Sequence, residues 1–154
     1  MILSPERASF DRVTELVWLG SRITSVEDFA RLRKEGVRAC VDMKREGADP
    51  WGFDAFLWLP TADHDAPSQV HLRLGLSFLR ECEQAALPVF VACHAGVGRS
   101  STLVLAHLLC GRFRDQPGQA ALDFLMARRP LARPNPEQVE AARLAAFAFL
   151  ETGC

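Results

Sequence analysis

The sequence lacks the features that mark a membrane protein or a nucleic-acid-binding protein. Its 18 lysine and arginine residues are balanced by 19 aspartate and glutamate residues, so the net charge is −1. A protein that binds nucleic acid through bulk positive charge is therefore not expected. A membrane span needs about 20 consecutive apolar residues, whereas apolar runs such as Leu103–Cys110, which contains His107, are far shorter. We expect neither a nucleic-acid partner nor a membrane partner.

Paired cysteines are also lacking. The cysteine count is odd, no two cysteines have a CxxC spacing, and we find no secretory signal peptide. Because a disulfide framework needs pairs and an oxidising compartment, we expect reduced thiols and a cytoplasmic location. No cluster of histidine, cysteine and acidic residues has the spacing of metal ligands, so no metal is expected. The five cysteines are Cys40, Cys82 and Cys110, which are expected in the core, Cys93, and Cys154 at a frayed end.

What is present indicates one folded domain. The chain has 154 residues, of which 49% are hydrophobic and 24% are charged. Domains typically contain about 100–200 residues, and a chain of this size buries enough surface to fold without disulfide or metal cross-links. No repeat, low-complexity tract or linker divides it. We therefore expect a single domain over residues 1–154, and a monomer.

Short apolar segments alternate with stretches of helical periodicity. Strands are expected at residues 16–20, 37–43, 56–59 and 89–92, because these segments are short and apolar. Helices are expected after the capping box of Ser25 and Asp28, after Ser68, at residues 100–113 and 118–128, and from Asn135 to Gly153. Strands separated by helices predict an α/β fold with a central, mainly parallel sheet flanked by helices.

One strand–loop–helix segment carries the chemistry. The apolar strand 89–92 leads into Cys93, a short loop with two glycines follows, and a helix begins near Ser100. Open α/β sheets bind ligands at this point, where loop N–H groups and the helix start form an anion site. Arg99 adds a planar group that can bind two phosphate oxygens. We therefore expect a phosphate-binding loop made of His94, Ala95, Gly96, Val97, Gly98 and Arg99.

The same loop suits a reaction at phosphorus. The N–H groups and Arg99 favour the thiolate of Cys93, which is then placed to attack a bound phosphate. The Ser100 hydroxyl can donate to the sulfur and make it a better leaving group. The departing alcohol needs a proton, and a carboxylic acid on a loop would supply it. Asp63 is the expected acid and Asp65 the reserve, since both lie in the polar loop 61–67.

The run from Cys93 to Ser100 has the form C-x5-R-S, which resembles the signature of the cysteine-dependent protein tyrosine phosphatase superfamily, and its small dual-specificity branch in particular. The segments 18–21, 41–46, 60–67 and 129–138 are similar to that branch as well, and Asp63 matches its general acid, four residues before a proline. The resemblance implies a sheet flanked by helices, a phospho-cysteine intermediate, and no metal or organic cofactor. One position departs from the family: Ala92 precedes the cysteine, where the family usually has a histidine that helps keep the cysteine ionised.

The implied substrate is a phosphorylated protein or a small phosphomonoester. The sequence has no tyrosine to line a deep slot, so we expect a shallow pocket that accepts phosphotyrosine and also phosphoserine or phosphothreonine. A phosphoinositide, a nucleotide or an RNA 5′-phosphate is the alternative substrate. A rhodanese-like sulfurtransferase also fits the cysteine loop but would not need Asp63. A phosphate-binding module without catalysis fits as well, although the cysteine, the arginine and the acid are all present.

The remaining polar residues have two readings each. Arg128, Arg129 and Arg133 are expected either to attract an anionic substrate or to form a solvated helix end. Asn135 and Gln138 are expected to cap and cover the last helix, with a contact to the phosphate-binding loop as the alternative. His94 is expected at the rim of the pocket, while His71 and His107 are expected to be structural.

Overall fold

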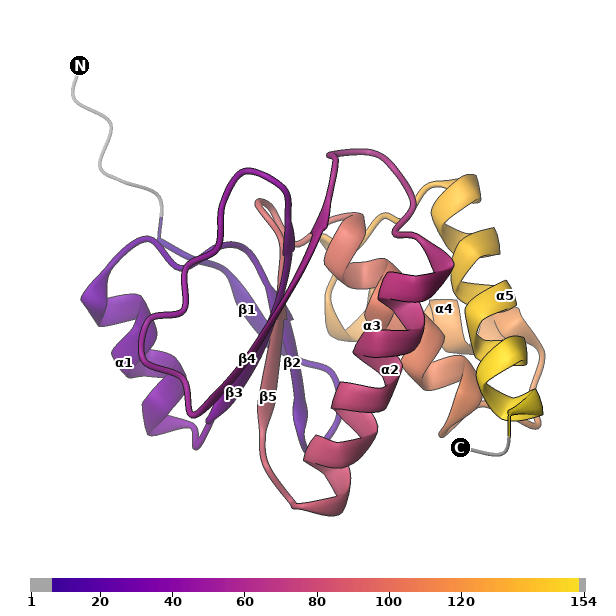
Figure 1. Ribbon diagram of the computed structural model, residues 1–154, viewed down its shortest axis with the longest axis horizontal. Coiled ribbons are helices and arrows are strands. Elements are labelled where there is room, and N and C mark those ends of the chain that lie inside the picture. The colour runs from indigo at the N-terminus through magenta and orange to yellow at the C-terminus, as the bar shows by residue number, and fades with distance from the viewer. Residues whose placement is uncertain (1–6, 153–154) are drawn as a thin grey trace.

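A computed structural model describes residues 7–152, which form a mixed sheet with helices on both faces (Figure 1). In this part of the chain the strands lie in the order β1-β2-β5-β3-β4. They are β1 (Phe10–Arg12), β2 (Val17–Gly20), β3 (Ala39–Lys44), β4 (Ala55–Thr61) and β5 (Val89–Ala92). All neighbouring strands are parallel except β1 and β2, which are antiparallel. The predicted α/β fold with a mainly parallel sheet is confirmed.

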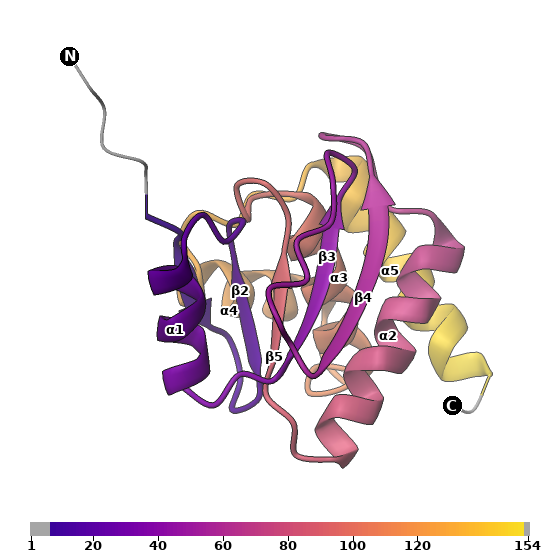
Figure 2. The same cartoon turned by 60° about the vertical axis from the view of Figure 1, so that its left-hand side comes forward.

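The helices cover the two faces unequally. They are α1 (Val26–Lys34), α2 (Gln69–Gln84), α3 (Arg99–Cys110), α4 (Gly118–Arg128) and α5 (Pro136–Glu151). Helix α1 lies alone on one face, and the other helices lie on the opposite face, as the two views show (Figures 1 and 2). The described residues accordingly form a larger apolar cluster on the α3 side and a smaller one on the α1 side.

The centre of the sheet explains why its strands read as apolar runs. Every residue of β3 and β5 is buried, because helices cover both faces of these inner strands. Helix α3, which directly follows β5, is buried along residues 99–108. It therefore starts at the carboxyl edge of the sheet, where the sheet on one side and the neighbouring helices on the other hold it in place.

The predicted element boundaries agree closely at the centre of the fold and less well at its edges. The strand 89–92 and the helix 118–128 have their predicted bounds. Helix α3 ends at Cys110, before Gly111, rather than at residue 113. Strand β1 was not predicted, since three residues carry too little periodicity to stand out. The predicted helix end at Gly153 and the position of Cys154 lie outside the described residues.

The start of α1 differs from a standard capping box. The Ser25 side chain accepts a hydrogen bond from the Asp28 N–H, as predicted. The Asp28 carboxylate, however, accepts from the N–H and hydroxyl of Thr24 and from the N–H of Ala8, not from Ser25. Burial would raise the pKa of Asp28, but these hydrogen bonds together lower it. Asp28 therefore ties the segment before β1 to the start of α1.

Replacing Asp28 with alanine should destabilise the fold. The change removes a buried acceptor of several hydrogen bonds, which costs about 1–3 kcal/mol of unfolding free energy. Urea denaturation at neutral pH measures the loss, and Glu27→Ala, one position earlier on the exposed side of α1, should stay within about 0.5 kcal/mol of wild type. Because the pKa of Asp28 is lowered, the gap should be full above pH about 4 and shrink as the pH falls further.

Candidate active site

The loop 93–99, called the cysteine loop below, joins the end of β5 to the start of α3 at the carboxyl edge of the sheet. Cys93 is buried, and its Sγ lies 3.1 Å from the Ser100 Oγ and accepts a hydrogen bond from the Gly96 N–H at 3.3 Å. Gly96 has a φ of 69°, and a Cβ on it would lie 2.5 Å from the carbonyl carbon of Gly20. Only glycine fits there, so the turn that wraps the loop around the sulfur depends on it.

Arg99 is almost fully buried beside this sulfur. One of its Nη atoms donates to Glu46 Oε1 at 2.6 Å and to the Thr61 carbonyl at 2.8 Å, and the other donates to Glu46 Oε2 at 3.1 Å. Its Nε is buried without a hydrogen-bond partner among the described residues. A buried donor left unpaired in an otherwise paired side chain is well suited to an anionic ligand.

Glu46 and Arg99 form an ion pair that the sequence did not reveal. The hydrogen bond from Arg99 is the main reason that the pKa of Glu46 falls to about 2. Burial alone would lower the pKa of Arg99, but Glu46 and the Cys93 sulfur raise it, so the guanidinium stays charged. In the sequence Glu46 was only part of an acidic turn after a strand. The position of Glu46 could have indicated this contact, because β3 and β5 are neighbouring parallel strands and the segments that follow them lie at the same edge of the sheet.

The polar loop after β4 brings one of the two candidate acids to Arg99. Asp63 Oδ1 lies 3.7 Å from an Arg99 Nη atom, and the carboxylate is about two-thirds exposed. Asp65 makes no ion pair within the described residues, and its backbone N–H is bonded to the Ala62 carbonyl. The geometry therefore brings the carboxylate of Asp63, rather than that of Asp65, within ion-pair distance of Arg99.

Two side chains at the start of α5 hold this polar loop in place. The Asn135 amide donates to the His64 carbonyl at 2.9 Å, and the Gln138 amide donates to the Asp65 carbonyl at 3.0 Å. The predicted cap at Asn135 is confirmed as a full capping box with Gln138. The prediction that Gln138 lies on the helix surface is wrong, since it is buried and its amide packs against Gly98 of the cysteine loop.

Arg129 supports the cysteine loop from behind. It was expected to attract substrate or to lie at a solvated helix end, but it is fully buried. Its Nε donates to the Gly96 carbonyl at 2.8 Å, and an Nη atom donates to the Ala95 carbonyl at 3.1 Å. Its other Nη atom is 2.9 Å from Asp11 Oδ2 on β1. Because these two carbonyl groups point toward Arg129, the N–H groups of the same peptide units point to the opposite side of the loop. Arg128 and Arg133 are exposed, as expected.

His94 of the cysteine loop lies at the rim of the site, as the sequence predicted. Its side chain is 54% exposed, and its Nδ1 lies 3.9 Å from Glu46 Oε2.

The last residue of β5 is Ala92, where the family usually has a histidine. Ala92 pairs with Asp42 in the sheet and borders a void of about 10 Å³ that is lined in part by Lys44. The Lys44 ammonium binds Asp42, and the hydrogen bonds that it donates to Asp42 and Asp49 raise its pKa despite burial. A buried ion pair thus occupies this side of the sheet.

The other described cysteines lie away from the loop. Cys40 and Cys82 are buried and Cys110 is partly buried. Burial raises the pKa of Cys82 and of Cys110 to about 11 and also raises that of Cys40. These three residues therefore remain neutral thiols, as expected of core cysteines.

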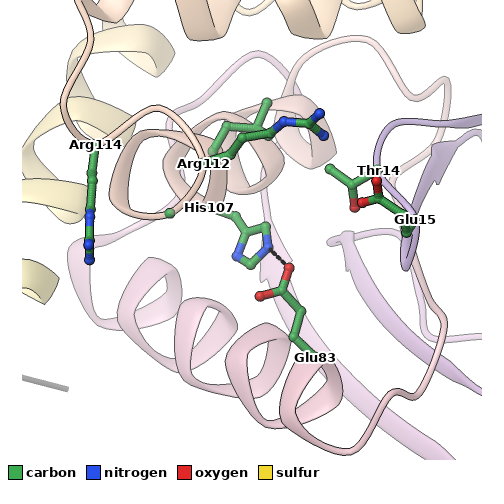
Figure 3. Close-up of a pocket in the computed structure, with 8 residues that line it drawn as sticks. Thr14, Glu15, Glu83, His107, Arg112 and Arg114 are labelled. Atoms are coloured by element: carbon green, nitrogen blue, oxygen red, sulfur yellow. Dashed lines mark hydrogen bonds and ion pairs between the residues drawn. The ribbon is translucent and has the colours of Figure 1, made fainter.

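A separate pocket of about 460 Å³ contains none of these residues (Figure 3). Its main polar feature is a hydrogen bond of 2.8 Å between His107 Nε2 and Glu83 Oε1, with Arg112 and Thr14 nearby in the view. His107 is thus a paired structural histidine, as predicted. Within residues 7–152, no group of three or more histidine, cysteine or acidic residues is arranged to hold a metal ion. No helix in this range has the length and hydropathy of a membrane span.

A mainly parallel sheet that presents a cysteine and a buried arginine on a loop before a central helix defines a class of α/β domain with an anion-binding loop. Comparison with known families identifies it further. The profile "Dual specificity phosphatase, catalytic domain" matches residues 17–144. The chain belongs to this family.

Individual relatives carry different names. "Dual specificity protein phosphatase 22" of Homo sapiens is 33% identical over 118 residues, which are 75% of this chain and 53% of that protein. "Phosphatidylglycerophosphate phosphatase PTPMT2" of Arabidopsis thaliana is 28% identical over 137 residues, 84% of this chain and 59% of that protein. The crystal structure of human DUSP28 superposes with a TM-score of 0.79 at 25% identity, covering 96% of this chain and 99% of that one. This chain spans somewhat more than half the length of the two relatives matched by sequence, dual specificity protein phosphatase 22 and the Arabidopsis thaliana phosphatase.

Replacing Glu46 with glutamine should loosen Arg99 without removing its charge. We expect kcat/KM for a small aryl phosphate to fall by about 3- to 30-fold, mostly through KM, because a charge-assisted hydrogen bond is lost. Since the pKa of Glu46 is about 2, the effect should be constant between pH 5 and 8. Any gain in fold stability from the pair is present above pH about 4.5 and is lost as the pH falls toward 2. Glu81→Gln, an exposed change on α2, is the control, and equal kinetics for the two variants would contradict the role of Glu46.

Proposed function

We propose that this protein hydrolyses phosphomonoesters on phosphoproteins through a phospho-cysteine intermediate, and that Cys93, Arg99, Ser100 and Asp63 carry out the reaction. The observation that carries the proposal is the buried Nε of Arg99, which has no partner among the described residues although the rest of the guanidinium is paired. A phosphate in the cysteine loop would accept from it and from the N–H groups of residues 94–99. Membership of the dual specificity phosphatase family supports the proposal.

In the first step the Cys93 thiolate attacks phosphorus. A P–S bond forms while the P–O bond to the leaving group breaks, and Asp63 gives its proton to the departing oxygen. Arg99 and the loop N–H groups stabilise the charge on the phosphoryl oxygens in the transition state. The ionised sulfur is stabilised by the Gly96 N–H at 3.3 Å and by the Ser100 hydroxyl at 3.1 Å.

In the second step water replaces the sulfur. The Asp63 carboxylate accepts a proton from the water as its oxygen attacks phosphorus, and the P–S bond breaks to release phosphate and the thiolate. Ser100 donates to the leaving sulfur in this step. The short distance from Asp63 Oδ1 to Arg99, 3.7 Å, supports this assignment over Asp65, because both partners must reach the same phosphate.

The proposed substrates are phosphotyrosine and also phosphoserine or phosphothreonine, cleaved by a single-domain monomer in the cytoplasm without metal, cofactor, nucleic acid or membrane. The names of the dual specificity phosphatase relatives support a protein substrate. The Arabidopsis thaliana relative is named for a lipid substrate, which makes a phosphoinositide or other non-protein phosphomonoester the second candidate. Against a highly charged inositol, the loop has His94 and Val97 and no lysine.

Cys93→Ser should abolish hydrolysis of a small aryl phosphate. Serine keeps the shape of the side chain but loses the thiolate, so we expect at least a 1,000-fold lower kcat, on the order of the loss seen when a catalytic nucleophile is removed. Release of the aryl alcohol at pH 6–7 measures it. Cys82→Ser, in the core, is the matched control and should retain activity. Undiminished hydrolysis by Cys93→Ser would rule out the mechanism.

Asp63→Ala and Asp65→Ala should separate the two candidate acids. General acid catalysis contributes about 100- to 10,000-fold, so Asp63→Ala should lower kcat by that order for an alkyl phosphate and less for a substrate with a good leaving group. Asp65→Ala should stay within a few-fold of wild type. The reverse result would move the acid to Asp65. Full activity in both variants would contradict the proposal that this loop supplies the acid.

A further inference from the structure

A groove of about 780 Å³ runs beside the cysteine loop and is not used by the mechanism above. Three loop residues, His94, Ala95 and Val97, form one wall. The segment after β2 forms another, and it is fixed to the loop because the Arg22 N–H donates to the His94 carbonyl at 3.1 Å. His94 also lies 3.9 Å from Glu46, the partner of Arg99. The groove therefore continues from the rim of the phosphate site.

The order of the strands puts the groove and the acid on different sides of the reacting phosphate. The cysteine loop follows β5, the groove segment follows β2, and Asp63 follows β4, in a sheet ordered β1-β2-β5-β3-β4. On the side of Asp63, the hydrogen bonds from Asn135 and Gln138 hold the polar loop against the start of α5. A substrate longer than a phosphate therefore has the groove on the open side of the loop.

The groove carries positive charge that the described residues do not neutralise. Arg7 and Arg22 line it, both are exposed, and neither forms an ion pair within residues 7–152. The carboxylate in the lining, Asp49, is already 3.0 Å from the Lys44 ammonium. Two unpaired guanidinium groups next to a phosphate site favour a ligand with negative charge beyond the phosphate itself.

The geometry points to a recognition site for an acidic side chain next to the phosphorylated residue. We propose that Arg22, with Arg7, binds a glutamate or aspartate that neighbours the phosphoresidue of a peptide substrate. The assignment rests on the proposed function, because it takes the cysteine loop as the site of the phosphate. The apolar part of the lining, which includes Ile23 and Leu131, would contact the stem of the neighbouring side chain.

Two phosphotyrosine peptides test this proposal if they differ only in having glutamate or alanine on both sides of the phosphotyrosine. In wild type we expect kcat/KM to be about three- to tenfold higher for the glutamate peptide, and this ratio should shrink as salt is added. In Arg22→Ala the ratio should fall toward one, and in Arg22→Glu a lysine-flanked peptide should become the better substrate. A ratio within each variant cancels any general effect on turnover.

Arg73→Ala is the matched control, because it removes an exposed arginine from α2 that does not line the groove. It should keep the wild-type ratio. The proposal is overturned if wild type has no preference, or if Arg22→Ala keeps the preference of wild type. It is also overturned if a phosphomonoester lipid in phosphatidylcholine vesicles is cleaved faster than both peptides and alone depends on Arg22.

The groove and the chemistry can fail separately. Fluorescence anisotropy with the same labelled peptides and the Cys93→Ser variant measures binding without turnover. If wild type cleaves neither peptide, the proposed function is wrong, while the ratio of the two dissociation constants in Cys93→Ser and in Cys93→Ser combined with Arg22→Ala still decides whether the groove selects acidic neighbours.

Discussion

The burial of two guanidinium groups, Arg99 and Arg129, is the constraint on which the rest of this site depends. A charge removed from water is stable only when other oxygen atoms replace the water. Arg99 obtains them chiefly from Glu46, and Arg129 obtains them from Asp11 and from carbonyl groups of the cysteine loop. Each arginine thereby fixes a segment distant in sequence. The cysteine loop is thereby held between two buried arginines, each of which is paired with a carboxylate.

The local part of the site could be predicted from the sequence, and the long-range part could not. A buried strand, a glycine loop and a helix start are written in consecutive residues, so the bounds of 89–92 and the placement of Cys93 required no tertiary information. Arg129 and Gln138 have no such local signal. Both are charged or polar residues at the ends of helices, where solvent exposure is the ordinary outcome. Only the packing of α4 and α5 behind the cysteine loop buries them.

The departure at Ala92 shows how the same fold meets a missing side chain. The residue faces the α1 side of the sheet, where the buried residues Asp42 and Lys44 form an ion pair and Lys44 also pairs with the exposed Asp49. The ammonium of Lys44 remains charged there because its carboxylate partners outweigh the cost of burial. The polar side chains on this side of the sheet therefore come from β3 and the turn after it, and not from the residue next to the cysteine.

The capping box of α5 has a consequence for engineering. Asn135 and Gln138 satisfy backbone groups at the helix start and, with the same amides, hold the segment that carries Asp63. The stability of the helix and the position of this loop thus depend on one pair of side chains. Substitutions at Asn135 or Gln138 that are chosen only for heat resistance would therefore also shift the loop that carries Asp63, the residue proposed above as the acid.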